Sequence, residues 1–187
     1  AKSALVVLDM PFGSYEISTT QALENGIRAM KESGVAALKI EGARTEQIRS
    51  MVDAGIPVMG HVGFTPQSVH ALGGFKVQGR GEAADKILQD CLAIQEAGAF
   101  AVVLEMVPAE LAARITKELT IPTIGIGAGN QTDAQILVWT DFAGLGEKSP
   151  SFAKQYLNLR ASLMVAAQSY RAEIQSGEFP AADKNFS

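Results

Sequence analysis

Short apolar runs alternate with helical patterns along this sequence, and that alternation most limits how the chain can fold. Most of the runs are apolar at every position, which is typical of parallel strands covered by helices on the sheet faces. The candidate strands are Ala4–Leu8, Val35–Ile40, Pro57–His61, Phe100–Glu105, Pro122–Ile126 and Ile136–Trp139. The pattern predicts an α/β fold built from repeated βα units.

Helical patterns occupy the intervals between these runs. The first covers Thr19 to Ser33, where Ser18 and Gln21 form a capping-box pattern and Gly34 ends the helix. The remaining helices are expected after Thr45 up to Gly55, over Glu82–Ala97, after Pro108, and over Phe152–Ser176, where the apolar stripe begins at Tyr156. Helix, glycine and strand thus follow one another repeatedly, as in an array of βα units.

Two architectures have this alternation: an open doubly wound sheet and a (βα)8 barrel. A nucleotide-binding doubly wound fold usually has a glycine-rich first turn, but Asn130 takes the last glycine position of GxGxxG, and the segment 74–81 lacks the Lys-Ser/Thr of a P-loop. Polar residues at strand ends favour the barrel, because the carboxyl ends of its strands form the active face. These residues, each ending a different candidate strand, are Asp9, Glu41, His61 and Glu105.

The length of the chain allows only part of such a barrel. A complete barrel has eight strands and roughly 250 residues, whereas this chain has 187 residues and six candidate strands. The last helix and tail resemble an ordinary ending. We therefore expect residues 1–187 to form a single (βα)8 TIM-barrel domain with about six of the eight βα units present and the N-terminal units missing.

Composition excludes several other classes of protein. Sixteen Lys and Arg against twenty Asp and Glu give a net charge of −4 with no basic run, so neither nucleic acid nor a membrane is an expected partner. The longest apolar runs, such as Ala99 to Leu104, are too short to span a bilayer. The single Cys91 excludes an internal disulfide framework, and the sequence opens without a targeting pattern, so a cytoplasmic location is expected.

The first candidate site residues are carboxylates near a lysine. Lys39 and Glu41 stand two positions apart on one strand, so their side chains share a face, either as an ion pair or as part of a site. Asp9, before Pro11, is either a turn residue or a ligand. Asp9 and Glu41 together offer two hard oxygen donors, which suits Mg²⁺. Zinc is disfavoured, because the chain has one Cys, two His and no HExxH motif.

His61 and Glu105 are candidates for proton chemistry. His61 precedes a long glycine-rich loop, Val62 to Gly81, and loops of this length are usually functional. Its ring either donates to a substrate oxygen or bonds to the loop backbone. Glu105 ends a strongly apolar strand, where a partly desolvated carboxylate suits a general base. The alternative is an ion pair with Arg114 or Lys117 on the next helix.

The sequence resembles the ketopantoate hydroxymethyltransferase (3-methyl-2-oxobutanoate hydroxymethyltransferase) family in stretches that span nearly the whole chain in order. The two most specific stretches are 60–68 (GHVGFTPQS) and 76–81 (KVQGRG), and the others are 9–12, 39–42, 104–108 and 121–129. The resemblance implies a barrel of the phosphoenolpyruvate/pyruvate type. It also implies assembly into a large, decamer-like homo-oligomer.

The resemblance further implies a reaction, the transfer of a hydroxymethyl group from 5,10-methylenetetrahydrofolate to 3-methyl-2-oxobutanoate, a 2-oxo acid. The product is 2-dehydropantoate, on the route to pantothenate and coenzyme A. By position, Asp9 and Glu41 correspond to magnesium ligands, and Asp9 and Lys39 to contacts with the oxo acid. Glu105 corresponds to the proton acceptor, and His61 to a residue near the substrate. A Mg²⁺-stabilised enolate is the implied intermediate.

Two departures from the family pattern accompany the resemblance. The family's upstream Gly-Asp-Ser segment, whose Asp is a further metal ligand, has no counterpart here. Thr140 and Ser151 stand where family members often have His and a basic residue. Two other hypotheses stay open on the sequence alone: a related barrel lyase acting on another 2-oxo acid, and a truncated paralogue without catalysis.

Overall fold

The computed structural model describes residues 3–181, and the chain divides into two compact units, Ala1–Ile136 and Leu137–Ser187. In the described part of the first unit, six strands form one sheet whose spatial order follows the chain, and all neighbours are parallel. The strands are β1 (Val7–Asp9), β2 (Ala37–Lys39), β3 (Val58–Gly63), β4 (Ala101–Glu105), β5 (Thr123–Ile126) and β6 (Ala134–Gln135). Doubly wound sheets reverse their order at a switch point, so this order confirms the barrel prediction.

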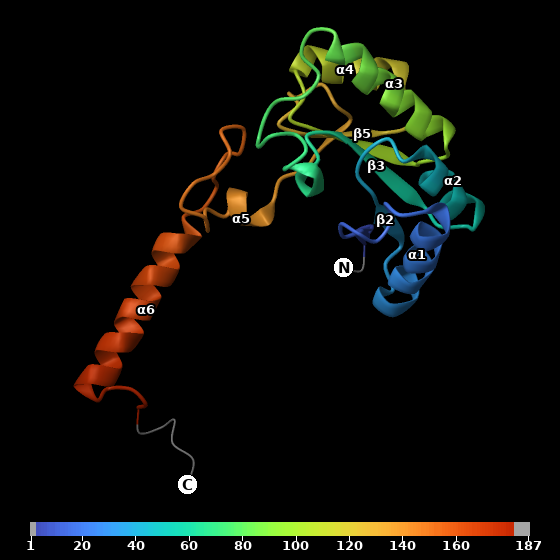
Figure 1. Cartoon of the computed structure of the whole chain (residues 1–187). Coiled ribbons are helices and arrows are strands. Elements are labelled where there is room, and N and C mark those ends of the chain that lie inside the picture. The colour runs from blue at the N-terminus through green and yellow to red at the C-terminus, as the bar shows by residue number, and fades with distance from the viewer. Residues whose placement is uncertain (1–2, 182–187) are drawn as a thin grey trace. The chain divides into compact units, whose positions relative to one another are not determined.

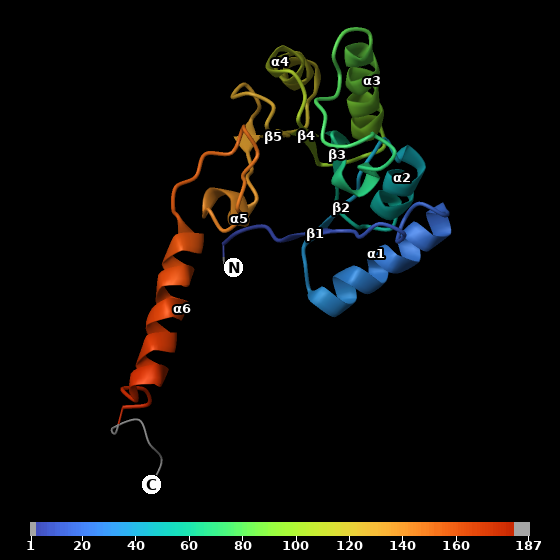
Figure 2. The ribbon, with the colours of Figure 1, turned by 60° about the vertical axis from the view of Figure 1, so that its left-hand side comes forward.

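Four helices cover one face of this sheet, as Figures 1 and 2 show. They are α1 (Thr19–Ser33), α2 (Thr45–Asp53), α3 (Ala83–Glu96) and α4 (Ala109–Glu118). Between helices and sheet lies a core whose fully buried members include Leu38, Ile48, Met51, Ile94, Val102, Leu104 and Ile115. Because strand side chains alternate between faces, the residues between these core positions point to the opposite side, here called the inner face.

Helix α1 has the bounds that its capping residues predict. The N–H of Gln21 donates to Ser18 Oγ over 3.1 Å, and the Gln21 side chain accepts in return from the N–H of Ile17, one residue before the cap. Gly34 ends the helix in the left-handed conformation, with φ 69°. Local side-chain chemistry therefore sets both ends of the helix.

The last predicted strand was wrong in position. The structure has a two-residue strand, β6, directly before the predicted Ile136–Trp139, and residues Trp139–Phe142 form the short helix α5. Asp133 accepts hydrogen bonds from the N–H and hydroxyl of Thr123, and these bonds align the segment beside β5. Ile136 and Val138, whose β-branched side chains suggested a strand, are half exposed. Apolar composition alone did not fix where the pairing occurs.

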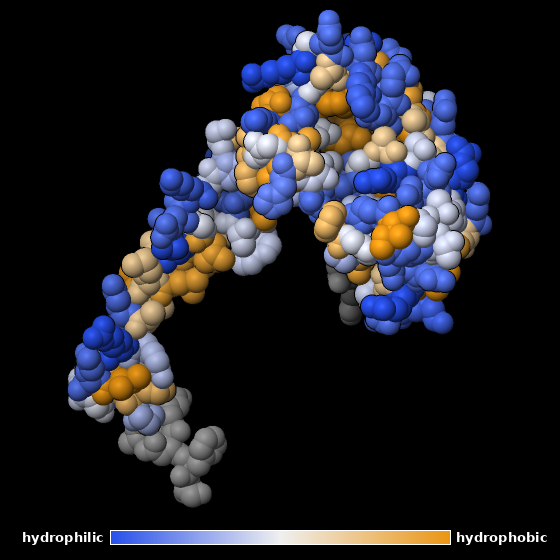
Figure 3. Space-filling view, viewed as in Figure 1, coloured by the Kyte–Doolittle hydropathy of each residue, from blue (hydrophilic) through white to orange (hydrophobic). Residues whose placement is uncertain are grey.

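In the second unit, helix α6 (Leu159–Ser176) begins later than Phe152, the predicted start. Asn158 Oδ1 accepts from the N–H of Ala161 and sets the start, so Tyr156 lies before the helix. None of the α6 residues is buried, and Figure 3 shows apolar side chains along the helix; they include Leu163, Met164, Val165, Tyr170 and Ile174. No helix within residues 3–181 combines the length and apolar character that crossing a bilayer requires.

Cys91 on α3 is fully buried, which gives a testable property. Burial, with a smaller contribution from the charge of Asp90, raises the pKa of the thiol from 9.0 to about 12. At pH 8 we expect the native chain to react with a thiol reagent such as dithionitrobenzoate roughly 10³-fold more slowly than the urea-unfolded chain, because the thiolate is the reactive form. Equal rates in the two states would show that the helix does not protect the thiol.

Candidate active site

Four predicted site residues form one connected group on the inner face, here called the polar row: Asp9, Lys39, His61 and Glu105. The Lys39 ammonium lies 2.8 Å from Asp9 Oδ1 and 3.1 Å from His61 Nδ1. On the other side of the ring, His61 Nε2 lies 3.2 Å from Glu105 Oε2. Each residue comes from a different strand, so the row crosses the sheet from β1 to β4.

The strand register explains how these residues meet. Asp9 is paired with Lys39 in the β1–β2 ladder, and Gly63, two residues beyond His61, is paired with Glu105 in the β3–β4 ladder. The neighbours of Lys39, Leu38 and Ile40, point into the core beneath the helices. The polar row therefore follows from the alternation of strand side chains and from the in-register parallel pairing.

Lys39 and Glu41 do share a face, as their spacing predicts. Both approach the same atom, His61 Nδ1, the Lys39 ammonium at 3.1 Å and Glu41 Oε1 at 3.8 Å. The ion pair of Lys39 is made with Asp9 rather than with Glu41. The lysine thus joins β1 to β3 across the inner face.

His61 lies inside β3 rather than at the start of a loop, and its ring is almost fully buried. An ammonium group can only donate, so Nδ1 accepts from Lys39 and the proton of the neutral ring is on Nε2. That N–H faces Glu105 Oε2, but it is not aligned well enough for a hydrogen bond. Among the described residues Nε2 therefore stays without a hydrogen bond, in contact with the carboxylate of Glu105.

Glu105 is the last residue of β4, and its side chain is 14% exposed. Arg114 makes its ion pair with Asp85 instead, at 2.7 Å, so the alternative pairing of Glu105 with Arg114 is wrong. The following residue, Met106, has a positive φ of 47°, which is uncommon for a residue other than glycine. The backbone turns sharply there, directly after the candidate base.

Glu41 is buried and held by neighbours that the sequence analysis missed. Its Oε2 accepts from the N–H of Gln67, and its own N–H donates to the hydroxyl of Tyr15. Burial raises the pKa of the Glu41 carboxyl, while His61, the Gln67 N–H and Lys39 act in the opposite direction. Tyr15 is buried whereas nearby Phe12 is 72% exposed, and a loop without periodicity gives no signal that separates the two.

The donor set fits Mg²⁺ better than a metal held entirely by protein. Among residues 3–181, no group of three or more His, Cys, Asp or Glu side chains is arranged to hold a metal ion. The chain offers two carboxylates instead, Asp9, which is half exposed, and Glu41, which is buried. Mg²⁺ commonly takes one or two carboxylates and keeps water or substrate oxygens in its remaining positions.

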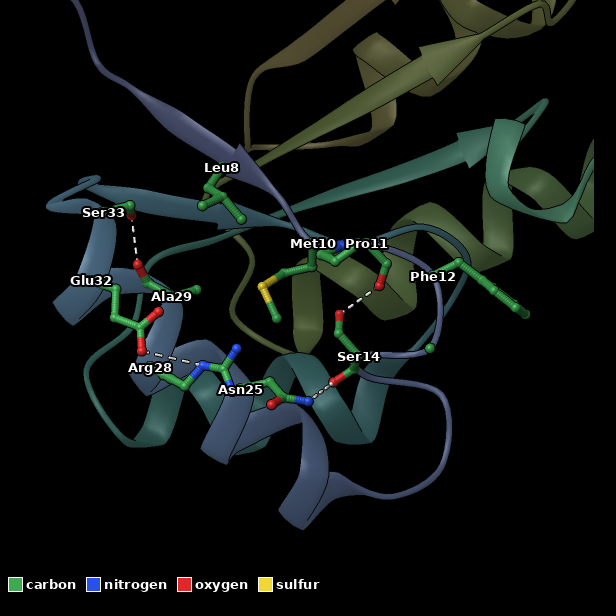
Figure 4. Close-up of a pocket in the computed structure, with 11 residues that line it drawn as sticks. Leu8, Met10, Pro11, Phe12, Ser14, Asn25, Arg28, Ala29, Glu32 and Ser33 are labelled. Carbon is green, nitrogen blue, oxygen red and sulfur yellow. Dashed lines mark hydrogen bonds and ion pairs between the residues drawn. The ribbon is translucent and has the colours of Figure 1, made fainter.

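A cavity of about 510 Å³ lies apart from these residues. It lies between β1 and α1, lined by Leu8 and Met10 from the strand side and by Asn25, Arg28 and Glu32 from the helix (Figure 4). Leu8 and Asp9 point to opposite faces of the sheet. The cavity is therefore on the helix side, away from the polar row on the inner face.

The sheet order, with charged side chains at the carboxyl ends of successive strands, defines a (βα)8-barrel enzyme fold. Solved structures with this likeness include phosphoenolpyruvate phosphomutase from Streptomyces platensis subsp. rosaceus (TM-score 0.51, 15% identity, 97% of this chain and 65% of that one). Another is 2,3-dimethylmalate lyase, a member of the PEP mutase/isocitrate lyase superfamily (TM-score 0.52, 15% identity, 97% and 64%). At this identity the likeness shows the fold alone.

The family profile of ketopantoate hydroxymethyltransferase matches residues 1–182, and the chain belongs to this family. The 3-methyl-2-oxobutanoate hydroxymethyltransferase of Leifsonia xyli subsp. xyli is 57% identical over 100% of this chain and 68% of its own length. The enzyme of the same name from Acidothermus cellulolyticus is 58% identical over 100% and 70%. The chain thus spans about two thirds of the length of these relatives.

Proposed function

We propose that this chain transfers a hydroxymethyl group from 5,10-methylenetetrahydrofolate to 3-methyl-2-oxobutanoate, forming 2-dehydropantoate for pantothenate and coenzyme A biosynthesis. Membership of the transferase family supports the reaction. The structural observation that carries the proposal is the polar row, in which two carboxylates, an imidazole and an ammonium lie along one face, at or near the carboxyl ends of the strands.

Three residues of the row, Glu105, His61 and Lys39, act on the oxo acid or beside it in this reaction. Water releases the one-carbon unit of methylenetetrahydrofolate at the oxidation level of formaldehyde, and tetrahydrofolate leaves. Glu105 accepts the proton from C3 of the oxo acid, and the enolate carbon bonds to the carbon of that unit, whose oxygen, taken from water, becomes the hydroxyl group. The buried ring of His61 lies against the Glu105 carboxylate, with Nε2 3.2 Å from Oε2, and limits where that carboxylate can lie. The ammonium of Lys39 lies where it stabilises the negative charge that develops on the oxo acid.

Asp9 and Glu41 are the residues that would hold Mg²⁺ in this proposal. The ion, when bound, supplies Lewis-acid stabilisation of the enolate through oxygens of the oxo acid. The buried carboxylate of Glu41 favours a neighbouring cation, because its desolvated charge is only partly balanced by the groups around it. The half-exposed Asp9 leaves room for water and substrate oxygens.

The direct test is a product assay with the purified chain, Mg²⁺, the oxo acid and methylenetetrahydrofolate. We expect 2-dehydropantoate to form only when all three additions are present, and the rate to fall when a chelator removes the metal. Consumption of a 2-oxo acid without folate would favour a barrel lyase instead. A chain that binds the oxo acid but forms no product under any of these conditions contradicts the proposal.

Self-assembly in the cytoplasm is part of the same proposal. The half-exposed apolar side chains of α6, among them Leu163, Val165 and Tyr170, support a homo-oligomer, since contiguous apolar surface marks interaction sites. The single cysteine supports a reducing compartment. Light scattering behind size exclusion tests the assembly, and a strictly monomeric chain at micromolar concentration would contradict it.

A further inference from the structure

A closed set of hydrogen bonds joins Glu41 to two residues that are not part of the polar row. The hydroxyl of Tyr15 accepts from the backbone N–H of Glu41 over 3.2 Å and donates to Gln67 Oε1 over 2.9 Å. The backbone N–H of Gln67 donates to Glu41 Oε2 over 3.0 Å. Both ends of Glu41, its amide and its carboxylate, are thereby fixed by the same two residues, here called the Tyr15–Gln67 clamp.

The clamp also reaches the end of the neighbouring strand. The side-chain amide of Gln67 donates to the carbonyl of Met10 over 2.9 Å, and Met10 is the residue directly after Asp9. Gln67 is in the short 3-10 helix Pro66–Ser68 that follows β3, and Tyr15 is in the loop between β1 and α1. One pair of side chains therefore ties together the chain segments that follow β1, β2 and β3.

Packing alone does not account for a tyrosine at this position. Tyr15 is 1% exposed, and burial raises the pKa of its phenol to about 12, so the group stays protonated and can donate to Gln67. A buried hydroxyl is costly unless it is bonded, and here both of its bonds lead to Glu41, one directly and one through Gln67. The hydroxyl thus serves the geometry of the carboxylate.

We propose that Tyr15 and Gln67 are positioning residues, which hold the carboxylate of Glu41 and the strand end beside Asp9 in the geometry that binds Mg²⁺. This inference rests on the proposed function. With Oε2 held by the Gln67 N–H, the second oxygen of Glu41 keeps its orientation toward the inner face, where Oε1 lies 3.8 Å from His61 Nδ1. Groups that orient metal ligands in this way typically contribute a factor of about 10 to 100 in metal affinity.

The test compares metal binding by matched variants of the 187-residue chain, with Mn²⁺ as the probe and free Mn²⁺ followed by electron paramagnetic resonance. Tyr15→Phe removes only the hydroxyl, and Gln67→Met removes the side-chain amide but leaves the backbone N–H on Glu41. Tyr170→Phe makes the same chemical change as the first variant at a half-exposed position on α6. Thermal unfolding of every variant is recorded in parallel.

We expect Tyr15→Phe and Gln67→Met each to weaken Mn²⁺ binding by about 10- to 100-fold, and Tyr170→Phe to leave it unchanged. Because the two residues act as one unit, the double variant should lose little more than the single variants. Lowered thermal stability with unchanged Mn²⁺ affinity would overturn the proposal, as would a wild-type chain that binds no Mn²⁺. Suppose instead that Mn²⁺ affinity falls in the clamp variants as expected but that the wild-type chain makes no 2-dehydropantoate. That result would overturn the proposed function alone.

Discussion

Glu105→Gln is expected to lower kcat for 2-dehydropantoate formation by about 10²- to 10⁴-fold, the usual contribution of a positioned general base. The amide has nearly the same shape as the carboxylate but cannot accept the proton from C3. Its position at the end of β4, 3.2 Å from His61 Nε2, changes little with the substitution. The measurement is steady-state kinetics with the oxo acid varied at saturating folate and Mg²⁺.

The matched control is Glu118→Gln, which makes the same change at the last residue of α4, on an exposed position. It should leave kcat unchanged. Mn²⁺ affinity should be similar in both variants and wild type, since Glu105 is not among the proposed metal ligands. A Glu105→Gln enzyme with a wild-type kcat would show that Glu105 is not the base.

Gly63→Ala is expected to have the largest effect on the structure of the site. Gly63 has a φ of 90°, a conformation that side chains rarely adopt, and an added Cβ would meet the carbonyl oxygen of Glu105 and lie 2.7 Å from Val107 Cγ1. That carbonyl also accepts from the N–H of Phe64. We expect a loss of about 1–3 kcal/mol in the free energy of unfolding from backbone strain, with a further loss from the clash.

Gly55→Ala separates the two contributions, because Gly55 has a φ of 88° and no atom within 4 Å of the added Cβ. Urea denaturation of both variants should show a smaller loss for Gly55→Ala than for Gly63→Ala. The difference between them reports the close approach of β3 to the end of β4. Activity should fall only in Gly63→Ala, because only that change displaces Glu105; equal stability losses and equal activities would contradict the role given to this contact.

The positions of the candidate site residues were predictable where strand geometry alone determines them. Asp9, Lys39, Glu41, His61 and Glu105 stand at or near strand ends, and parallel strands in chain order bring such ends to one edge. The two-residue spacing of Lys39 and Glu41 fixed their common face. Both inferences follow from the two-residue period of a strand and from the order of the strands in the sheet.

The partners within the site were not predictable, because they depend on how loops fold back. Lys39 forms its ion pair with Asp9 and not with Glu41, and this depends on the side-chain conformations across β1 and β2. The bonds of Tyr15 and Gln67 to Glu41 join loop residues far apart in sequence. Likewise, the bonds between Asp133 and Thr123 hold the start of β6 beside β5, before the apolar run that the prediction used.

The most direct test of the central claim, that the polar row takes the proton from C3 of the oxo acid, is hydrogen exchange at that carbon. Proton NMR of 3-methyl-2-oxobutanoate in D₂O, with the chain and Mg²⁺ but without folate, separates proton removal from transfer of the one-carbon unit. We expect the C3 signal to decay with wild type and with Glu118→Gln, and to persist with Glu105→Gln. Exchange at the wild-type rate in Glu105→Gln, or none above the protein-free rate in wild type, would contradict the claim.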